Sequence, residues 1–465
     1  MESGDSSFPC KTGVDIYNWS KTFSCTPEMF CEPTNVDELK QILLHAQSKK
    51  RTVRVMGAGH SPSDIAFTND ILVSMRRMNH LISVNKELCQ VTVESGMLID
   101  ELNPLLTENG LALSVLPSVS DMSIGGAVGT GTHGSGINYG TLSSYVTALD
   151  LLIADGTVLH CSREENSEVF LAAACGLGAM GIVIQLTLQC EPRFNLTQKH
   201  YGEKMSTVLA NLDQHLKNSE HFKFMWYPHT DDVIVCEINR TPYNKVRRVQ
   251  ITKDKLLWER FWMILLFLST YLIEFLYWVS TFIPGITAYI NRLAFHLHKG
   301  PTEVDDVSYR IFNFDCLFQQ FVTDWAIPIE KTGEAVTHLK EWLDTQDDTV
   351  VAHFPVEVRF VKKDDMYMSP AYGRDTAFIN IIVYRPYGKE IMKDQLWTYY
   401  ENLMEKHDGR PHWAKEHKVD GSKLVRMYPH FKDWCRIREN LDPNRIFVNR
   451  YISQLLGSDA SQSML

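Results

Sequence analysis

The sequence predicts an α+β protein built from two unlike domains. With 465 residues, the chain is longer than a typical single domain. Between residues 30 and 190, short strand-like runs alternate with helical ones and glycines separate them, whereas after Cys190-Glu191-Pro192 the composition shifts toward aromatic residues. We therefore expect one domain over residues 14–195 and a second over residues 196–455.

Each element of this pattern has its own signal. Residues 36–49 place apolar side chains at helical spacing, and residues 52–56 alternate as a strand does. Residues 117–140 contain seven glycines and predict a long loop, whose length needs a functional reason. The same criteria predict strands over 71–74, 89–94, 145–153, 181–188, 356–361 and 378–384, and helices over 98–109, 165–174 and 394–406.

Composition and charge exclude several classes of protein. Hydrophobic residues make up 44% and charged residues 22%, which is ordinary for a globular chain. The net charge of −10 argues against general nucleic-acid binding, because nothing draws the whole molecule to a phosphate backbone. Ten cysteines are scattered without a CxxC pair, so we expect reduced thiols and neither a zinc ribbon nor a disulfide scaffold.

Targeting signals are few. The first 13 residues are polar and contain no apolar core, so the sequence predicts no cleaved secretory signal. Residues 261–283 form a 23-residue apolar run with Glu274 as its only charge, which is long enough to cross a bilayer. The final Ser-Met-Leu is similar to a peroxisomal tripeptide but lacks its basic middle residue, so we give it little weight.

Three glycine-rich loops in the first domain point to a bound dinucleotide. Residues 129–134 and 176–181 both match GxGxxG, but neither lies between a strand and a following helix as a Rossmann fingerprint requires. Glycine loops also bind phosphate through successive backbone N–H groups without a helix. Any one such loop is equally explained as a tight turn, whereas loops at 56–61, 123–136 and 176–181 together favour a flavin dinucleotide.

His60 stands at the tip of the first loop, directly after a predicted strand. A lone histidine is more often a surface or hydrogen-bonded residue than a catalyst or ligand. No HxxxH pair or carboxylate cluster accompanies it, so the sequence indicates no metal site there.

Seven motifs carry a resemblance to a known family. They are GAGHSPSD at 57–64, SIGGAVGTGTHGSG at 123–136, DWAIP at 324–328, VEVR at 356–359, YRPYG at 384–388, RPHWAK at 410–415 and LDP at 441–443. In this order they resemble the sugar-1,4-lactone oxidoreductases of the vanillyl-alcohol-oxidase flavoprotein superfamily, and most of all the animal L-gulono-1,4-lactone oxidases. The resemblance runs from about residue 14 to 455 and implies an FAD-binding domain of two α+β subdomains followed by a cap that covers the flavin ring.

The resemblance also implies which residues line the cofactor. His60 matches the histidine that many members bond covalently to the flavin 8α-methyl group, which raises the flavin potential and prevents loss of the cofactor. The residues implied to hold FAD are Gly57, Ala58, Gly59, His60, Ser61, Ser123, Gly126, Gly131, Thr132, Gly134, Ser135, Gly136 and Ile182.

Glu357 and Arg359 are two residues apart, so on a strand both side chains leave the same face. From the residues alone, a surface ion pair is the simpler explanation. The resemblance implies instead that Arg359 stabilises negative charge on the substrate C2 oxygen and the reduced flavin, while Glu357 binds lactone hydroxyl groups and orients Arg359. It also places His412 and Lys415 in the catalytic site, with Lys415 near the N1–C2=O edge of the flavin.

The implied reaction is oxidation of L-gulono-1,4-lactone at C2, with hydride transfer to flavin N5 and dioxygen as the acceptor, giving ascorbate and hydrogen peroxide. One alternative is a dehydrogenase that acts on galactono- or arabinono-lactone and reduces cytochrome c or a quinone. A second alternative, outside enzymes, is an inactive membrane-bound flavoprotein scaffold.

The apolar run at 261–283 separates the two halves of this implied site. His60 precedes it, whereas Glu357, Arg359, His412 and Lys415 follow it, and one active site cannot have a bilayer through its middle. A second crossing would need about 20 further apolar residues, which the following stretch does not supply. We therefore expect association with one leaflet of the endoplasmic-reticulum (microsomal) membrane, and the alternative is a wholly buried helix.

Overall fold

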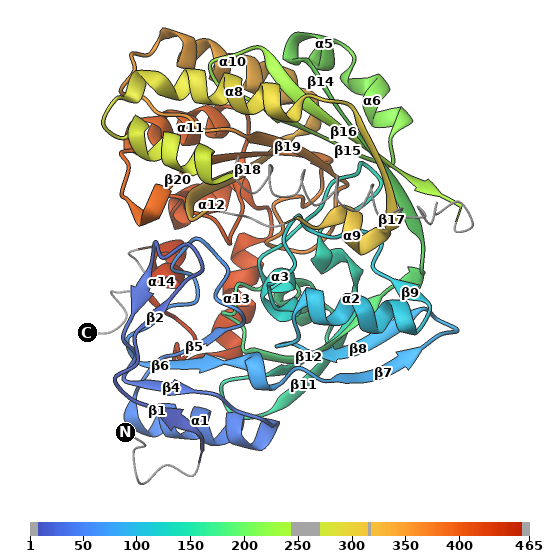
Figure 1. Ribbon diagram of the computed structural model, residues 1–465. Helices are drawn as coiled ribbons and strands as arrows, with labels where there is room; N and C mark the ends of the chain where they lie inside the picture. The colour runs from blue at the N-terminus through green and yellow to red at the C-terminus, as the bar shows by residue number, and fades with distance from the viewer. Residues whose placement is uncertain (1–7, 243–269, 315–317, 458–465) are drawn as a thin grey trace, which may run out of the picture.

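The computed structural model describes residues 8–242, 270–314 and 318–457 and has the predicted α+β architecture. Two domains lie one above the other in Figure 1, the first built mainly from the amino-terminal half of the chain. The site between them is built on three sheets, two in the first domain and one in the second.

The first domain consists of two α+β subdomains, as expected. A mixed four-stranded sheet, in the order β1-β4-β6-β5, packs against α1, and an antiparallel sheet, in the order β11-β10-β12-β8-β7, forms the second subdomain. Asn35 caps α1 by accepting a hydrogen bond from the Glu38 N–H, and Lys50 ends it in the left-handed conformation. The elements of this domain are β1 (Cys10–Lys11), β2 (Ile16–Tyr17), β3 (Ser24–Cys25), β4 (Met29–Cys31), α1 (Val36–Lys49), β5 (Val53–Met56), β6 (Ile71–Ser74), β7 (Leu81–Asn85), β8 (Gln90–Glu94), α2 (Ile99–Glu108), β9 (Leu111–Ala112), α3 (Ile124–Gly129), β10 (Val146–Leu152), β11 (Val158–Ser162), α4 (Ser167–Ala173), β12 (Ile182–Gln189) and β13 (Glu191–Pro192).

The second domain is an eight-stranded antiparallel sheet in the order β17-β14-β16-β15-β19-β20-β18-β21. Helices α5, α6, α10 and α11 cover its outer face, and its inner face looks toward the first domain (Figure 1). The elements that follow β13 in the chain are β14 (Asn195–Lys204), α5 (Met205–Ala210), α6 (Leu212–Asn218), β15 (His221–Trp226), β16 (Asp232–Thr241), α8 (Thr287–His298), β17 (Thr302–Val307), α9 (Ser308–Phe312), β18 (Gln320–Pro328), α10 (Thr332–Thr345), β19 (Val356–Val361), β20 (Thr376–Tyr384), α11 (Asp394–Lys406), β21 (Arg410–Pro411), α12 (Gly421–Met427), α13 (Phe431–Leu441) and α14 (Arg450–Leu456).

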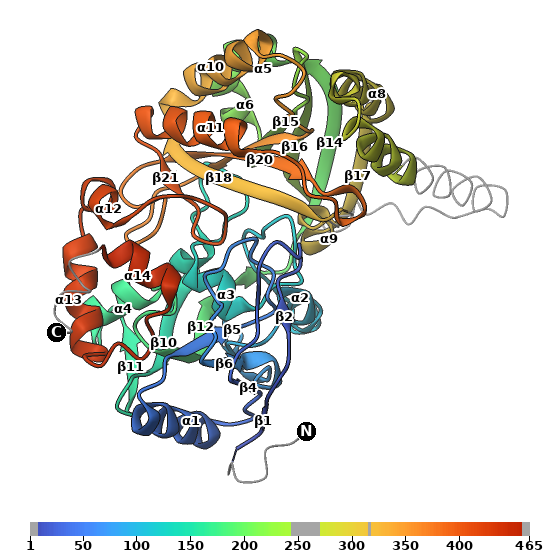
Figure 2. The ribbon, with the colours of Figure 1, turned by 90° about the vertical axis from the view of Figure 1, so that its left-hand side faces the viewer.

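The carboxyl-terminal helices depart from the predicted division at residue 195. Figure 2 shows α13 and α14 beside α4 and β10 of the first domain, below the cap sheet. Ile446 accepts a backbone hydrogen bond from Val53, and Ile446 and Phe447 belong to the same buried cluster as α1 and β5. The range 196–455 is therefore not one spatial unit, because its last helices complete the first domain.

Most predicted elements are confirmed, and the strand at 356–361 and the helix at 394–406 have the predicted bounds. The region 117–140 differs, because it contains the short helix α3, which Ser123 caps by accepting from the Gly126 N–H. Its glycines concealed this helix, since glycine disfavours helical backbone.

The expectation of reduced thiols is wrong at one pair of cysteines. Cys10 and Cys31 form a disulfide that joins β1 to β4. They are 21 residues apart, and only the pairing of these two strands brings them together. Of the remaining described cysteines, five are buried free thiols.

The apolar run at 261–283 is described only in part, since residues 261–269 lie outside the described residues. Residues 270–280 form a helix that packs beside α8, where the Tyr277 hydroxyl donates to Asn291 at 2.7 Å. Tyr277 is fully buried, whereas Leu272, Phe275 and Phe282 are exposed. Within the described part of the chain, no helix is both long and apolar enough to cross a membrane.

Candidate active site between the two domains

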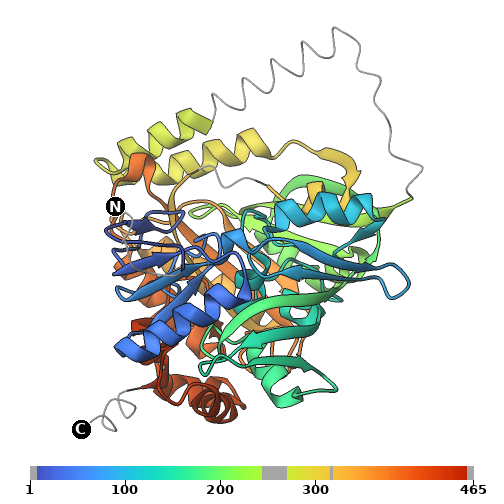
Figure 3. The ribbon, with the colours of Figure 1, turned by 90° about the horizontal axis from the view of Figure 1, so that it is seen from below.

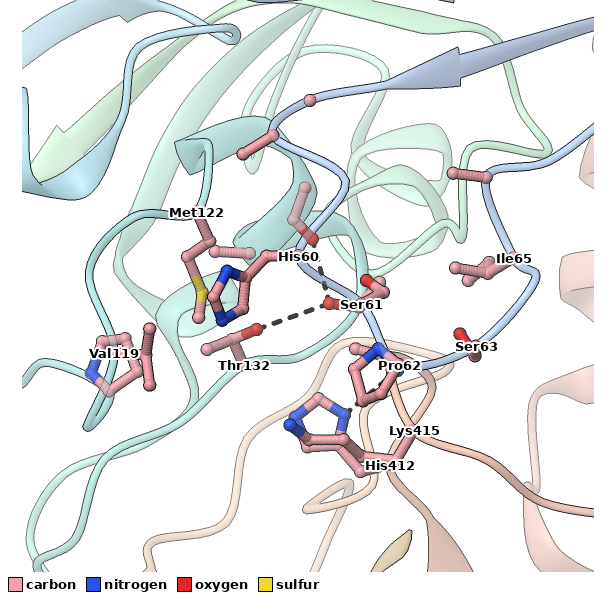
Figure 4. A pocket seen from close by; sticks show the side chains of 18 of the residues that line it. His60, Ser61, Pro62, Ser63, Ile65, Val119, Met122, Thr132, His412 and Lys415 are labelled. Atoms are coloured by element: carbon pink, nitrogen blue, oxygen red, sulfur yellow. Dashed lines mark hydrogen bonds between the residues drawn. The ribbon is translucent and has the colours of Figure 1, made fainter. Parts of the chain in front are cut away.

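A cavity of about 410 Å³ lies between the domains and is lined by residues of both. The amino-terminal domain contributes its three glycine-rich loops, and the cap contributes side chains from β18, β19, β20 and the segment after β21. Figure 4 shows His60, Ser61 and Thr132 lining the same pocket as His412 and Lys415. The predicted site residues from the two halves of the chain are thus brought together.

The first glycine loop fits a phosphate or flavin group. Among the described residues, no acceptor lies in hydrogen-bonding position for the backbone N–H groups of residues 57–61, which line the cavity. A Cβ atom at Gly57 would lie 1.7 Å from the Ser123 hydroxyl oxygen, so only glycine permits the first two loops to approach this closely. Successive unpaired N–H groups are the donors that bind anionic oxygens.

His60 is packed rather than freely exposed. Its ring stacks on Trp19, with the centroids 5.0 Å apart and an interplanar angle of 25°. Burial, which outweighs the attraction of the Asp121 carboxylate, lowers the pKa of His60 to about 4, and the Lys415 ammonium contributes to the decrease. The imidazole is therefore neutral near pH 7 and keeps a nitrogen lone pair.

Arg54 holds the loops in place, and the sequence analysis did not single it out. Its guanidinium is buried and donates to four backbone carbonyls, at distances of 2.6 to 3.1 Å. One acceptor, Ile65, lies shortly after the first glycine loop, and Leu177 and Gly178 lie in the third. The fourth, Phe447, lies near the carboxyl terminus. A charged residue inside the strand-like run VRVM was the available signal.

The second glycine loop divides into two parts. Ser123, Gly126 and Thr132 line the cavity, as do Ile182 after the third loop and the predicted residues 57–61. Gly131, Gly134, Ser135 and Gly136 are not among the residues that line it, and their cofactor role stays a prediction. Instead, Ser135 accepts from the Phe360 N–H and donates to the Phe222 carbonyl, and the Gly136 N–H donates to the Phe360 carbonyl at 2.6 Å. This part of the loop therefore joins the first domain to the cap sheet.

The register of the cap sheet explains why charged side chains converge on its inner face. Residues directly opposite one another on antiparallel strands project to the same side. Lys223 on β15 is opposite Arg359, Glu357 is opposite Asn380 on β20, and Asn380 is opposite Asp324 on β18. Since Glu357 and Arg359 also share a face, five polar side chains from four strands meet in one row.

Within this row, positive and negative charges alternate. The Lys223 Nζ donates to Glu357 Oε1 at 2.9 Å, and Glu357 Oε2 lies 3.5 Å from Arg359 Nε without the alignment of a hydrogen bond. The Arg359 Nη2 in turn donates to Asp324 Oδ2 at 3.3 Å. All four side chains are at most 10% exposed, so the surface ion pair that the sequence left open is excluded.

These neighbours keep both carboxylates ionised. Burial alone would raise the pKa of Glu357, but the Lys223 ammonium and the Arg359 guanidinium outweigh it and lower this pKa to about 2. Burial would likewise raise the pKa of Asp324, but the contact with His133 and the charge of Arg359 hold it well below its usual range. Glu357 is therefore suited to accept hydrogen bonds and poorly suited to take up a proton.

His412 enters the site from the segment after β21. Its backbone N–H donates to the Asp324 carbonyl at 2.9 Å, which ties it to β18. Burial lowers its pKa well below the usual value, and its Nδ1 accepts from the Ala414 N–H at 3.1 Å, which assigns the ring proton to Nε2. Lys415 also lines the cavity, three residues further on.

Two further residues escaped the sequence analysis. Lys223 forms an ion pair with Glu357. The sequence signal for Lys223 was a lysine inside the otherwise apolar strand HFKFMW. His133 stacks on Phe378 at 3.5 Å between ring centroids and lies 3.7 Å from Asp324. Asp324 belongs to the DWAIP motif, but nothing in the sequence indicated that its carboxylate reaches Arg359.

Comparison with known proteins identifies the family. The pattern described as "FAD binding domain" matches residues 27–162, and the pattern described as "D-arabinono-1,4-lactone oxidase" matches residues 186–455, more than half of the chain. The chain belongs to the sugar-1,4-lactone oxidase family. The predicted resemblance is thereby confirmed, and the first domain is an FAD-binding domain.

Individual relatives agree with this assignment. The L-gulonolactone oxidase of Bos taurus is 45% identical over 95% of this chain and 98% of that protein. The L-gulono-1,4-lactone dehydrogenase of Mycobacterium tuberculosis is 30% identical over 95% of this chain and 98% of that protein. Among solved structures, a solvent-stable cholesterol oxidase covers 97% of this chain and 98% of its own, with a TM-score of 0.79 and 15% identity, which supports the fold alone.

Proposed function

We propose that this protein oxidises L-gulono-1,4-lactone at C2 to form ascorbate, with FAD as the hydride acceptor and dioxygen as the oxidant that produces hydrogen peroxide. The observation that carries the proposal is the row of buried charges on the cap sheet, which lines the same cavity as the FAD-binding loops. The identity to L-gulonolactone oxidases supports this substrate.

The chain's own side chains have distinct roles in the proposed reaction. FAD, when bound, supplies the hydride-accepting centre. Arg359 presents a fixed positive charge to the C2 oxygen as negative charge develops there, and Asp324 keeps its guanidinium in place. Glu357 accepts hydrogen bonds from lactone hydroxyl groups while Lys223 holds it ionised. The Nε2–H of His412 is a further donor toward the cavity.

The proposed function has one specific alternative, in which the reduced flavin passes its electrons to an acceptor other than dioxygen. The Mycobacterium relative, named a dehydrogenase, favours transfer to another acceptor as the second candidate function. Anaerobic reduction of the purified flavoprotein by L-gulono-1,4-lactone, followed by mixing with air-saturated buffer, distinguishes the two. Fast reoxidation supports the oxidase; slow reoxidation with fast cytochrome c reduction supports the dehydrogenase. No flavin in the purified protein would contradict both and leave an empty scaffold, and bound flavin that the lactone does not reduce would leave the inactive flavoprotein scaffold.

We also propose that FAD is bonded covalently to His60. The imidazole lines the cavity, is held by Trp19, and is neutral because burial lowers its pKa to about 4. A neutral nitrogen with a lone pair is the form that can bond to an electrophilic carbon.

His60→Ala is therefore expected to release the flavin from the protein on acid precipitation. In the wild type, flavin should stay in the acid-precipitated pellet and migrate with the protein under denaturing electrophoresis. His80→Ala is a matched control, since His80 is an exposed histidine outside the cavity. Wild-type flavin found wholly in the supernatant would contradict the covalent bond without affecting FAD binding.

The protein is proposed to attach to one leaflet of the endoplasmic-reticulum membrane through an apolar surface beside the cap. On α8, Tyr289, Leu293 and Leu297 are 68%, 40% and 50% exposed and recur every four residues on one side of the helix. The helix at 270–280 lies beside α8 in Figure 3. This helix and the residues that follow it expose further large apolar side chains: Tyr271, Leu272, Phe275, Phe282 and Ile283. Exposed apolar areas of this kind mark protein or membrane contacts.

Replacing Tyr289, Leu293 and Leu297 together by serine is expected to weaken flotation with phosphatidylcholine vesicles by at least about tenfold. A fully buried large apolar side chain contributes about 1.5–3 kcal/mol, and three partly inserted ones exceed the 1.4 kcal/mol of a tenfold change. Ile82→Ser with Leu88→Ser is the control, because these side chains are equally exposed on the β7–β8 hairpin of the other domain. Unchanged flotation of the α8 variant would exclude this surface.

A further inference from the structure

A cluster of metal-ligating side chains lies on the outer side of the cap, away from the cavity. Glu334 and His338 stand on α10, and His407 follows the last turn of α11. Figures 1 and 2 show both helices on the face of the sheet that is turned away from the FAD-binding domain. The cluster is therefore separate from the site described above.

The local structure explains why the three side chains converge. Glu334 and His338 are four residues apart, so on α10 they lie on the same face, one turn from each other. His407 is the C-cap of α11, and its backbone N–H is bonded to carbonyls of the last turn. The rings of Trp342 and Tyr399 stack at 3.9 Å and an angle of 4°, which fixes the two helices side by side.

The distances are close to those of a metal centre. One ligand atom from each of the three side chains lies within 4.8 Å of the others, and His407 Nδ1 is 4.0 Å from Glu334 Oε2. Tetrahedral zinc, with bonds of about 2.0–2.1 Å, separates its ligands by about 3.3 Å. The side chain of Glu334 is 62% exposed, so a rotamer change can supply the remaining movement, whereas His407 is 7% exposed and already placed.

Glu334 supplies a carboxylate to this depression, and the ammonium groups of Lys331 and Lys406 also border it. The Lys331 ammonium is paired with the Asp408 carboxylate at 2.5 Å. The remaining lining residues, Tyr399, Leu403 and Lys406, leave the depression open to water on one side.

We propose that Glu334, His338 and His407 form a binding site for one Zn²⁺ ion or a similar borderline transition-metal ion, with water as the fourth ligand. Two imidazoles and one carboxylate suit zinc, nickel or copper, whereas Mg²⁺ and Ca²⁺ prefer oxygen ligands alone. The bound ion joins α10 to the end of α11, five residues before His412. The proposal is independent of the proposed lactone oxidation.

The test is titration of the tag-free, flavin-loaded full chain with ZnSO₄, followed by calorimetry. One zinc ion per chain is expected at this site. Glu334→Gln, His338→Ala and His407→Gln should each weaken binding roughly tenfold or more, because each removes one of three protein ligands. Zinc should also raise the thermal midpoint of the wild type and raise it less in each variant, as expected for a ligand that binds only the folded state.

Controls separate this site from adventitious binding. His80 pairs with Glu94 at 2.7 Å without a second histidine, so His80→Gln should leave zinc binding unchanged. Co²⁺ in place of zinc should give tetrahedral absorption bands at wavelengths beyond the flavin bands, and MgCl₂ should not compete. Absence of zinc binding to the wild type, or equal binding by all three variants, would overturn the proposal. Glu334→Gln is the variant that perturbs packing least, since that side chain is 62% exposed.

Discussion

Arg359→Ala is expected to slow reduction of the flavin by L-gulono-1,4-lactone by about a hundredfold or more. The guanidinium is held by Asp324 and faces the cavity, so its charge is in place before negative charge develops on the substrate. Loss of one such preorganised donor costs about 3 kcal/mol of transition-state stabilisation. Anaerobic stopped-flow absorbance of the flavin measures this step without interference from reoxidation.

The same substitution leaves Asp324 buried without its main cationic partner, so structural loss must be separated from chemical loss. Arg359→Lys keeps a positive charge but not the planar guanidinium, and we expect it to recover only part of the rate. The flavin spectrum and thermal midpoint of each variant report on folding. A rate for Arg359→Ala equal to that of the wild type would show that the arginine only stabilises the sheet.

Arg54→Met is expected to destabilise the FAD-binding domain by about 3–5 kcal/mol. The variant leaves four carbonyls without their donor, and a buried unsatisfied acceptor costs about 1–3 kcal/mol before relaxation and water entry reduce the sum. We expect the thermal midpoint, followed by the rise in flavin fluorescence, to fall by on the order of 5–10 °C.

Arg51→Met is the matched control, since Arg51 lies three residues earlier and its ion pair with Glu28 is exposed. That substitution should change the thermal midpoint by no more than about 1–2 °C. Arg54→Lys, which retains the charge but loses the forked donors, should fall between the two. Equal midpoints for Arg54→Met and the wild type would exclude a role for this residue in holding the loops.

Local patterns were sufficient for most of the fold because their causes are local. The apolar period of 36–49 and the alternation of 356–361 each describe one element, and both have the predicted bounds. The short helix α3 was missed because its glycines disfavour helix, and its capping by Ser123 and its packing against the rest of the domain outweigh that preference.

Only those residues of the candidate site that belong to a recognisable sequence motif could be predicted. The first glycine loop, His60, Glu357 and Arg359 line the cavity, and all belong to quoted motifs. Gly136 belongs to the same kind of motif yet lies against Glu220 and His221 of the cap, and Gly134 lies against Val115 and Leu116 of its own domain. Glycine is needed wherever backbones approach closely, with or without a ligand. The spacing of Glu334 and His338 was visible in the sequence, but the third ligand was not.

By itself, the sequence determined the α+β class, the glycine loops, the family and the two residues of β19 that face one side. Only the tertiary structure decided which distant residues meet: Lys223 with Glu357, Asp324 with Arg359, and Cys10 with Cys31. The same holds for the return of α13 and α14 to the first domain. The physical reason is that periodicity records which face of an element is buried, whereas strand order and register, set by packing of the whole chain, decide what that face contacts.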